Sequence, residues 1–335
     1  MGVPWLLVPC LVSGLLSGLS AYNLYDNLND GSLQGGQLFG WSMVHHHQDL
    51  YVGAPLAGEA GKVLRCQSLA SKPVCGEGTI NPSPSSLLPG AWFGGSLAAS
   101  RDSLYTCAFR YDWTHWEDNG LQVGKCYKKG IRESRFSDYF DFSNTRFEVS
   151  YDPDWMETGF YGVSATVNIH GNLVVGNPVQ YSTKGYDKPS PRYTIGSIGE
   201  IKMVNTMRGR ILRLFRPRGQ VGWARREEYN NFKYAGYDVT SGNNTIIIGA
   251  PKADNFRGKV YICTDCFISS AIYREVSGTN IGEHFGSSVA ACDFTGDGRD
   301  DLVVGAPNFA KDRHSYNSGR VHVFIQQDFD FQRVR

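Results

Sequence analysis

The chain has 335 residues, of which 41% are hydrophobic and 19% are charged, and its formal net charge is +1 at pH 7. This composition argues against intrinsic disorder, and the near-zero net charge gives no electrostatic reason to expect binding to nucleic acid or to an acidic membrane surface. The 39 glycines and the 13% aromatic residues are typical of an all-β protein built from repeats.

Residues 5–19 form an apolar run, which is followed by the small residues Ser20 and Ala21. Such a run at the N-terminus predicts a secretory signal peptide over residues 1–20, even though basic residues before it are missing. A buried helix or a membrane anchor is the alternative, but the run is short for a membrane span. We therefore expect residues 21–335 on the extracellular or lumenal side.

After residue 20 an aromatic–glycine pair recurs five times, and each pair is followed by a short hydrophobic run and then by a Gly-x-Pro step or its remnant. The clean examples are Phe39-Gly40 with Gly53-Ala54-Pro55, and Phe285-Gly286 with Gly305-Ala306-Pro307. The β-type runs between these marks predict a hairpin in each unit, followed by a further strand. Repeated small antiparallel sheets, each too short to bury a core alone, suit the blades of a β-propeller.

This pattern resembles the FG-GAP repeats of integrin α subunits, and the resemblance covers nearly everything after residue 20. The opening Tyr22-Asn23-Leu24 also looks like the start of a mature integrin α chain. A complete integrin α propeller has seven blades, so the resemblance implies about five of seven, with the propeller at residues 21–335 incomplete at its C-terminus. The repeats are expected near residues 38–90, 91–150, 151–225, 226–275 and 276–335.

The resemblance implies the extracellular head of a cell-adhesion receptor. Such a head binds calcium, pairs with an integrin β subunit, recognises an extracellular-matrix protein and is not an enzyme. It stands outside the plasma membrane and would be anchored only through a missing C-terminal part, as a single-pass type I protein. Two alternatives stay open: a secreted FG-GAP protein without a β partner, and the propeller part of a phospholipase-like hydrolase. The hydrolase would carry a catalytic domain before its propeller, whereas the repeats here begin soon after residue 20.

The strongest chemical motif lies in the fifth repeat, at residues 293–301, where oxygen-bearing side chains recur at alternate positions between glycines. The expected ligands of one hard cation are the side chains of Asp293, Thr295, Asp297 and Asp301 and the carbonyl of Arg299. Calcium fits best, because three carboxylates without imidazole or thiolate disfavour zinc and copper. An acidic, solvated turn is the alternative. Thr295 replaces the more usual Asp or Asn, which should weaken the affinity.

Removing Cys10 with the signal peptide leaves seven cysteines, an odd number for an oxidising compartment. The spacings of Cys66 with Cys75 and of Cys107 with Cys126 resemble the disulfides that pin the early blades of integrin α subunits. The resemblance therefore implies a bridge in each of these two pairs.

The remaining cysteines lie in the fourth and fifth repeats. Cys263 and Cys266, at a strand end, are expected to form a third bridge, with a redox or metal site as the alternative. Cys292 lies on a predicted buried strand, where a cysteine behaves as a small apolar residue, and is the candidate for the unpaired thiol.

Three further motifs have a plain explanation beside a functional one. The run His45-His46-His47 invites a metal reading, but neighbours on a hairpin point to opposite faces, so a plain turn is favoured. Between Met207 and Arg226 stand seven arginines, which form either a solvated strand and loop or a basic patch for an acidic ligand or glycosaminoglycan. Asn243 begins a glycosylation sequon at the predicted tip of the fourth hairpin.

The resemblance also implies a docking ring for the β subunit, in which aromatic side chains beside the repeated pairs hold a basic side chain by cation–π contact. In this sequence the ring would consist of Trp41, Trp92, Phe160 and Tyr237. Ordinary packing within the blades is the alternative for each residue. The fifth repeat departs from the pattern, because His284 and Ser287 flank its pair.

Ligand choice is the least specific part of the resemblance. Integrins that bind Arg-Gly-Asp carry an Asp three residues before the aromatic–glycine unit of the fourth repeat, and Asn231 stands there in this chain. Asp152 and Asp154, before the third repeat, could still supply negative charge. An Arg-Gly-Asp receptor of the usual type is therefore disfavoured.

Overall fold

A computed structural model of the chain describes residues 38–67, 74–75, 87–113, 121–142, 160–179, 181–182, 193–194, 196–203, 210–215, 234–243, 245–264, 266–267, 272–312, 318–327 and 330–334. Within these ranges five antiparallel four-stranded sheets follow one another along the chain. We number them blades 1 to 5.

Each blade takes its strands in chain order from the inside to the outside. Blade 1 contains β1 (Ser42–His46), β2 (Asp49–Ala54), β3 (Lys62–Gln67) and β4 (Val74–Cys75). Blade 2 contains β5 (Ser96–Ala99), β6 (Ser103–Ala108), β9 (Lys125–Gly130) and β10 (Ser137–Asp141). Blade 3 contains β11 (Ala165–Val167), β12 (Leu173–Asn177), β15 (Ser197–Met203) and β16 (Arg210–Phe215). Blade 4 contains β17 (Val239–Ser241), β18 (Ile246–Ala250), β19 (Lys259–Thr264) and β20 (Ile272–Ser277). Blade 5 contains β21 (Ser288–Cys292), β22 (Asp301–Ala306), β23 (Arg320–Gln327) and β24 (Asp330–Arg333).

The described residues outside the blades form small elements. Two short hairpins pair β7 (Asp112–Trp113) with β8 (Leu121–Gln122), and β13 (Tyr181–Ser182) with β14 (Tyr193–Thr194). A single turn, α3 (Ala253–Phe256), follows β18. None of the helical residues that the structure describes forms a segment long and apolar enough to span a membrane.

The second strand of a blade is covered on both faces, which explains its sequence. All five residues of β18, Ile246–Ala250, are buried, and so are all five of β12. A strand sandwiched in this way reads as a continuous apolar run rather than as an alternation of apolar and polar residues. Branched residues such as isoleucine and valine, which fill these strands, suit the extended backbone.

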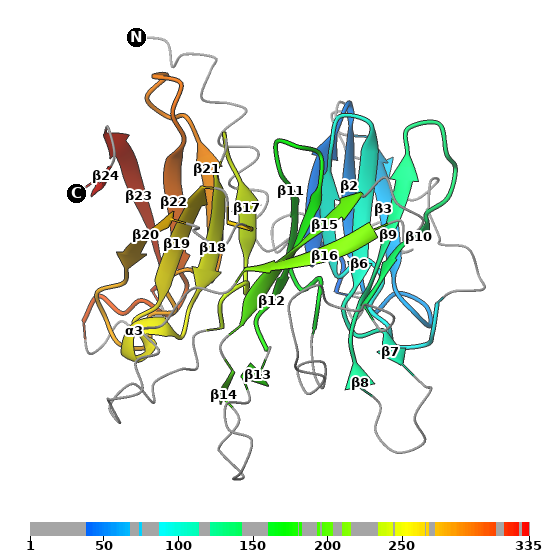
Figure 1. Ribbon diagram of the computed structural model, residues 1–335, viewed down its shortest axis with the longest axis horizontal. Coiled ribbons are helices and arrows are strands. Elements are labelled where there is room, and N and C mark those ends of the chain that lie inside the picture. Colours follow the sequence, from blue (N-terminus) through cyan, green and yellow to red (C-terminus); the bar gives the residue numbers. More distant parts are fainter. Residues whose placement is uncertain are drawn as a thin grey trace.

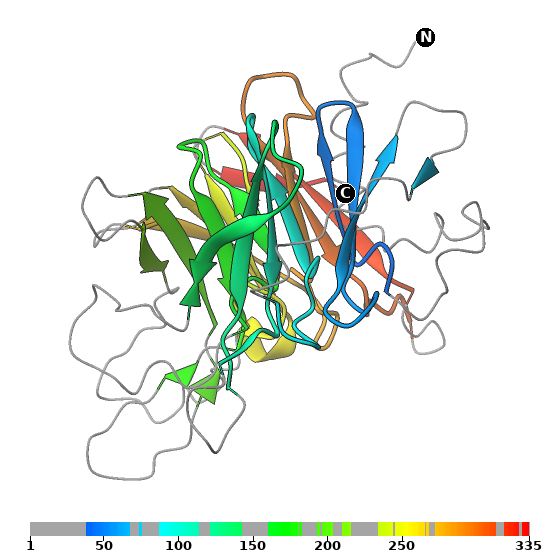
Figure 2. The same ribbon diagram turned by 90° about the vertical axis from the view of Figure 1, so that its right-hand side faces the viewer.

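The first strands of successive blades lie against one another: β1 contacts β5, β5 contacts β11, β11 contacts β17, and β17 contacts β21. Most strands run along the vertical in Figure 1, so the connecting turns gather at two opposite ends, and Figure 2 shows the same blades from the side. This arrangement is the β-propeller that the repeats predict. The fourth, outermost strand of each blade adds to the three that the repeat pattern indicates.

In the second, third and fifth repeats the aromatic side chain of the pair packs between two neighbouring blades. Phe93 is fully buried and meets Tyr127 and Phe136 edge to face, with ring centroids 5.3 and 5.4 Å apart. Phe285 is buried in the corresponding cluster between blades 4 and 5. Edge-to-face contacts of this kind add to the free energy gained from burying the rings themselves.

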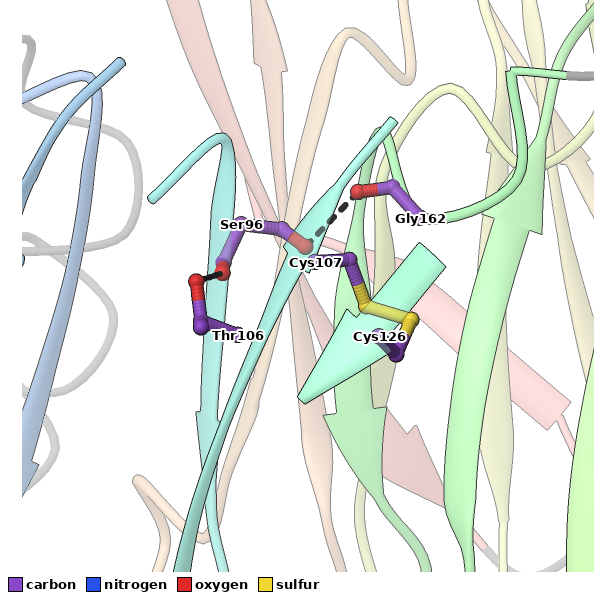
Figure 3. Close-up of a disulfide and its surroundings, with 5 residues drawn as sticks. All are labelled: Ser96, Thr106, Cys107, Cys126 and Gly162. Atoms are coloured by element: carbon purple, nitrogen blue, oxygen red, sulfur yellow. Dashed lines mark hydrogen bonds between the residues drawn. A yellow bond between two sulfur atoms is a disulfide. The ribbon is translucent and has the colours of Figure 1, made fainter. Parts of the chain in front are cut away.

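Blades also meet backbone to backbone. A Cβ atom built on Gly53 would lie 2.1 Å from the carbonyl oxygen of Gly94 in the next blade, so only glycine fits there. The hydroxyl of Ser42 donates a hydrogen bond of 2.8 Å to that same oxygen. The equivalent hydroxyl of Ser96 donates to the Gly162 carbonyl over 2.7 Å, as Figure 3 shows. We call such a boundary between two blades a seam.

Candidate functional site

The candidate metal loop, residues 293–301, joins β21 to β22. These strands pair in register up to Cys292 opposite Asp301, so the loop closes the first hairpin of blade 5. It forms the orange turn at the top of Figure 1, at what we call the hairpin end of the blades. Gly296 and Gly298 have φ angles of 74° and 82°, which side-chain-bearing residues rarely adopt. The glycines that the sequence singled out thus permit the tight turn.

The carboxylate of Asp293 lies inside this turn and organises it. Its Oδ1 accepts hydrogen bonds from the backbone N–H groups of Gly296 at 2.6 Å and Asp297 at 3.0 Å. Its Oδ2 accepts one from Gly298 at 2.8 Å. Successive N–H groups that converge in this way hold an anionic side chain in a fixed place.

Asp301 anchors the loop to the rest of the blade. It is fully buried, and its Oδ2 accepts from the N–H groups of Phe294 at 2.8 Å and Thr295 at 3.2 Å. Its Oδ1 accepts from Gln326 on β23 at 2.9 Å. The carboxylate of Asp301 accepts all three of these hydrogen bonds. Asp301 therefore stabilises the loop itself, in addition to any part that it plays in binding an ion.

The carboxylate of Asp297 forms an ion pair with Arg299. Its Oδ2 accepts from the Arg299 guanidinium at 2.6 and 3.0 Å, and these hydrogen bonds lower the pKa of Asp297. Among the residues that the structure describes, no three His, Cys, Asp or Glu side chains gather closely enough to hold a metal ion. The donors on the loop are nevertheless all oxygens, which is the chemistry that hard cations prefer. Binding one would require Asp297 to leave Arg299.

The four aromatic residues of the predicted docking ring lie at the other end of the blades. We call it the glycine end, because the aromatic–glycine pairs are there. Trp41 and Tyr237 directly follow the glycine of their pairs and are 50% and 44% exposed. Trp92 and Phe160 stand two residues before the glycine and are partly buried. In Figure 1 this end is marked by α3, below β18.

Three of these four aromatics belong to one row across blades 1 to 3. Trp41 meets Trp92 with ring centroids 5.5 Å apart, and Trp92 meets Phe109 at 5.3 Å. Phe109 then meets Phe160 at 6.2 Å. We call Trp41, Trp92, Phe109 and Phe160 the aromatic row. We did not identify Phe109 from the sequence as part of this group. The signal was present, because Phe109 is the aromatic residue that replaces proline in the degenerate second Gly-x-Pro step.

Two cations of the chain already lie over rings at this end. The guanidinium carbon of Arg110 is 5.0 Å from the centre of the Trp92 ring, and Lys252 Nζ is 4.1 Å from that of Tyr234. Each cation directly follows the third residue of a Gly-x-Pro step or its remnant, so the two contacts are equivalent in blades 2 and 4. Within the described residues no such cation covers Trp41 or Tyr237.

Comparison with known proteins places the chain in a family. The model of the FG-GAP repeat matches residues 285–324. Integrin alpha-8 of Gallus gallus is 28% identical over 353 residues, covering 95% of this chain and 32% of that protein. Integrin alpha-3 of Mus musculus is 27% identical, covering 87% and 29%, and integrin alpha-PS5 of Drosophila melanogaster is 30% identical, covering 88% and 30%. The chain is an FG-GAP propeller of the integrin α type.

This FG-GAP propeller spans about a third of the length of the curated relatives that it matches. A solved structure of a thermostable family-43 glycoside hydrolase aligns with 87% of this chain and 91% of its own, at 12% identity and a TM-score of 0.44. That likeness is too low to bear on fold or activity.

The cysteines of the propeller agree with the sequence in part. Cys107 on β6 and Cys126 on β9 form the predicted disulfide, drawn in Figure 3, and Cys263 is bonded to Cys266. Cys66 is disulfide-bonded, and the strand register sets it opposite Cys75, its predicted partner.

The expectation for Cys292 was wrong, because this residue is disulfide-bonded and no described cysteine is free. The expectation took Cys292 to be buried as a small apolar residue, whereas it lies at the end of β21 and is only partly buried.

The remaining candidates are placed as follows. His46 is buried against His47 and Tyr51, and burial lowers its pKa, which agrees with the plain-turn interpretation of the histidine run. Asn243 is exposed in the turn between β17 and β18, as the sequon requires. Three ligand candidates, Asp152, Asp154 and Asn231, lie outside the described residues, as does most of the arginine-rich stretch.

Proposed function

We propose that the chain serves as the extracellular head of an integrin α subunit, which pairs with an integrin β subunit and recognises an extracellular-matrix protein at the cell surface. The observation that carries this proposal is the aromatic row at the glycine end, on a propeller of the integrin α type. The role is binding rather than catalysis.

The surface has the properties of a protein-docking site. Trp41 is half exposed although it is one of the largest apolar side chains, and Leu56, from the loop after β2, is 44% exposed beside the same end of blade 1. Exposed aromatic side chains that cluster on one face are a common feature of protein interfaces and often dominate their affinity.

A cation of the β subunit would find its place over Trp41 and Tyr237. The rings of Trp92 and Tyr234 already carry Arg110 and Lys252, which would repel an incoming positive charge. We therefore assign β-subunit binding to Trp41 and Tyr237, the two aromatic side chains exposed beside the glycines. Trp92 packs against Trp41, and Phe160 packs against Phe109 farther along the aromatic row.

Calcium belongs to the same proposal. Asp293, Thr295, Asp297 and Asp301 with the Arg299 carbonyl would hold the ion, which would supply positive charge to a loop rich in carboxylates. Asp293 and Asp301 are already fixed by backbone N–H groups, so Asp297 is the ligand that must reorient. Asp152 and Asp154 stay our candidates for contact with the matrix ligand.

The test is co-expression of the full chain with candidate β subunits, followed by pull-down and circular dichroism to confirm folding. The double variant Trp41→Ala/Tyr237→Ala should lose most of the pairing, since a desolvated cation–π contact contributes roughly 2 kcal/mol. Ile131→Ala is the matched control, because Ile131 is 50% exposed but its N–H bonds to Asp102 at the hairpin end. Equal pairing of all folded forms would refute the docking site, whereas a folded natural chain that pairs with none of the β subunits would favour a secreted protein without a β partner.

A further inference from the structure

Three successive seams are closed by the same hydrogen bond. The serine that stands two residues after the glycine of each pair donates its hydroxyl to the carbonyl oxygen of the corresponding glycine in the next blade. The three bonds are Ser42 to Gly94 at 2.8 Å, Ser96 to Gly162 at 2.7 Å and Ser164 to Gly236 at 3.1 Å. A serine hydroxyl does not titrate near neutral pH, so the strength of these three hydrogen bonds does not depend on pH in that range.

The seam between blades 4 and 5 carries a different group at this position, Asp238. Its Oδ1 accepts from the N–H of Val239 at 2.9 Å, and its Oδ2 accepts from the N–H of Val289 on β21 at 2.8 Å. Gly286, which corresponds to the acceptor glycine of the other seams, is buried. None of the hydrogen bonds found among the described residues ends on its carbonyl oxygen.

Among the described residues, no charged side chain acts on the carboxylate of Asp238 as a counter-ion. The strands that make the main contacts with β17, which begins directly after Asp238, are β11, β12, β18 and β21, and none of these four contains Asp, Glu, His, Lys or Arg. Their only titratable side chain, that of Cys292, is disulfide-bonded. Loss of hydration in the seam raises the pKa of Asp238 to about 6, against the two backbone hydrogen bonds that lower it. The residue keeps some accessible surface, through which a proton can reach it.

We propose that Asp238 is a proton-operated clasp between blades 4 and 5. In its neutral form the carboxyl group donates its O–H to the carbonyl oxygen of Gly286, as the serines do in the preceding seams, while its other oxygen keeps the N–H of Val289. In its ionised form it has no proton to donate, and its charge faces a carbonyl oxygen that lacks a donor. The seam therefore holds more firmly in a mildly acidic compartment than at neutral pH.

The direction of the effect follows from linkage. The folded chain binds the proton of Asp238 with a pKa of about 6, above the ordinary value of 3.8, so this group contributes its full stability below pH 3.8. That contribution is lost as the pH rises through about 6. Over this window the loss amounts to roughly 100-fold in the equilibrium constant of opening if the whole shift is expressed.

The experiment compares the full chain with Asp238→Ser, Asp238→Asn and the control Ser164→Ala. Unfolding midpoints are measured from pH 4.5 to 7.5, together with hydrogen exchange of the segment containing Val289, corrected for its intrinsic rate. We expect Asp238→Ser to exceed the natural chain in stability at pH 7.5 and to lose that advantage towards pH 4.5. Asp238→Asn should show the same loss of pH dependence, because its amide stays neutral. Ser164→Ala should lower stability equally at every pH.

Two results would overturn the clasp. One is a natural chain whose pH profile runs parallel to those of Asp238→Ser and Asp238→Asn, both in the unfolding midpoint and in the exchange of the Val289 segment. The other is failure of Asp238→Ser to fold, because the residue that closes three equivalent seams would then be unable to close this one.

Discussion

The backbone N–H of Asn243, in the first turn of blade 4, donates a hydrogen bond to the carboxylate of Asp300 in the candidate metal loop of blade 5. The loop is thus attached to the neighbouring blade as well as to its own, and burial of Asp300 against this turn raises its pKa. An ion that orders the loop would therefore also stabilise the seam between blades 4 and 5, which Asp238 spans as well.

Calcium should stabilise the chain through this loop. An ion that binds only the folded form adds about 2.7 kcal/mol at a concentration of 100 times its Kd. We expect calcium to raise the thermal midpoint of the natural chain and to leave that of Asp293→Ala/Asp297→Ala unchanged, as calorimetric titration should also show. Asp102→Ala, in the corresponding exposed turn of blade 2, is the control and should respond like the natural chain. Undiminished calcium binding by the double variant would exclude the site.

Removing the Arg299 side chain should strengthen calcium binding. The predicted ligand at this position is the backbone carbonyl, whereas the guanidinium competes for Asp297 through its contacts of 2.6 and 3.0 Å. An exposed ion pair is weak because water screens it, so Arg299→Ala should lower the Kd only modestly, on the order of 2-fold. A weaker Kd in this variant, measured by the same titration, would mean that Asp297 is not a ligand.

The Cys107–Cys126 disulfide should be a major contributor to the stability of blade 2. It joins β6 to β9 across a sequence separation of 19, and both cysteines are fully buried. Replacing both by alanine should cost about 2–5 kcal/mol of unfolding free energy, measured by urea denaturation. The control is the natural chain under reducing conditions, which should lose at least as much. A loss below about 1 kcal/mol would contradict this assignment.

Asn177→Ala should stabilise the chain. Asn177 is fully buried, and neither polar atom of its side chain has a hydrogen-bond partner within the described residues. The equivalent position in the other four blades is alanine, in each case fully buried: Ala54, Ala108, Ala250 and Ala306. Removing an unsatisfied buried amide should gain about 1 kcal/mol, whereas the reverse change Ala250→Asn should cost about 1–3 kcal/mol. Urea denaturation of the two variants should therefore shift in opposite directions.

The sequence predicts the hairpins of the propeller well because the repeat marks have strict physical causes. Glycine is required where Gly53 meets the carbonyl of Gly94, and apolar runs such as β18 are required where both faces are covered. The outermost strands carry no such requirement, because one side of each lies at the rim of its blade. They therefore leave a weaker pattern, which the repeats do not reveal.

The candidate sites were harder to predict because they depend on contacts between distant residues. The spacing of the metal loop indicates its ligands, but it does not reveal that Arg299 turns back onto Asp297. Likewise Phe109 joins the aromatic row only because blades 2 and 3 set it beside Phe160. Asp238 looks like an ordinary polar residue until its place is compared with that of Ser164.

The seam glycines make the distance between blades a property of the main chain. Cβ atoms built on Gly53, Gly176 and Gly249 would lie 2.1, 2.0 and 2.1 Å from a carbonyl oxygen of the next blade. The main chain thus sets the spacing between two blades, and the side chains between them only fill the space that remains. Most interior side chains of such a propeller can therefore be substituted without changing its curvature. One methyl group added at a seam glycine, in contrast, would push two blades apart and tilt every blade beyond them.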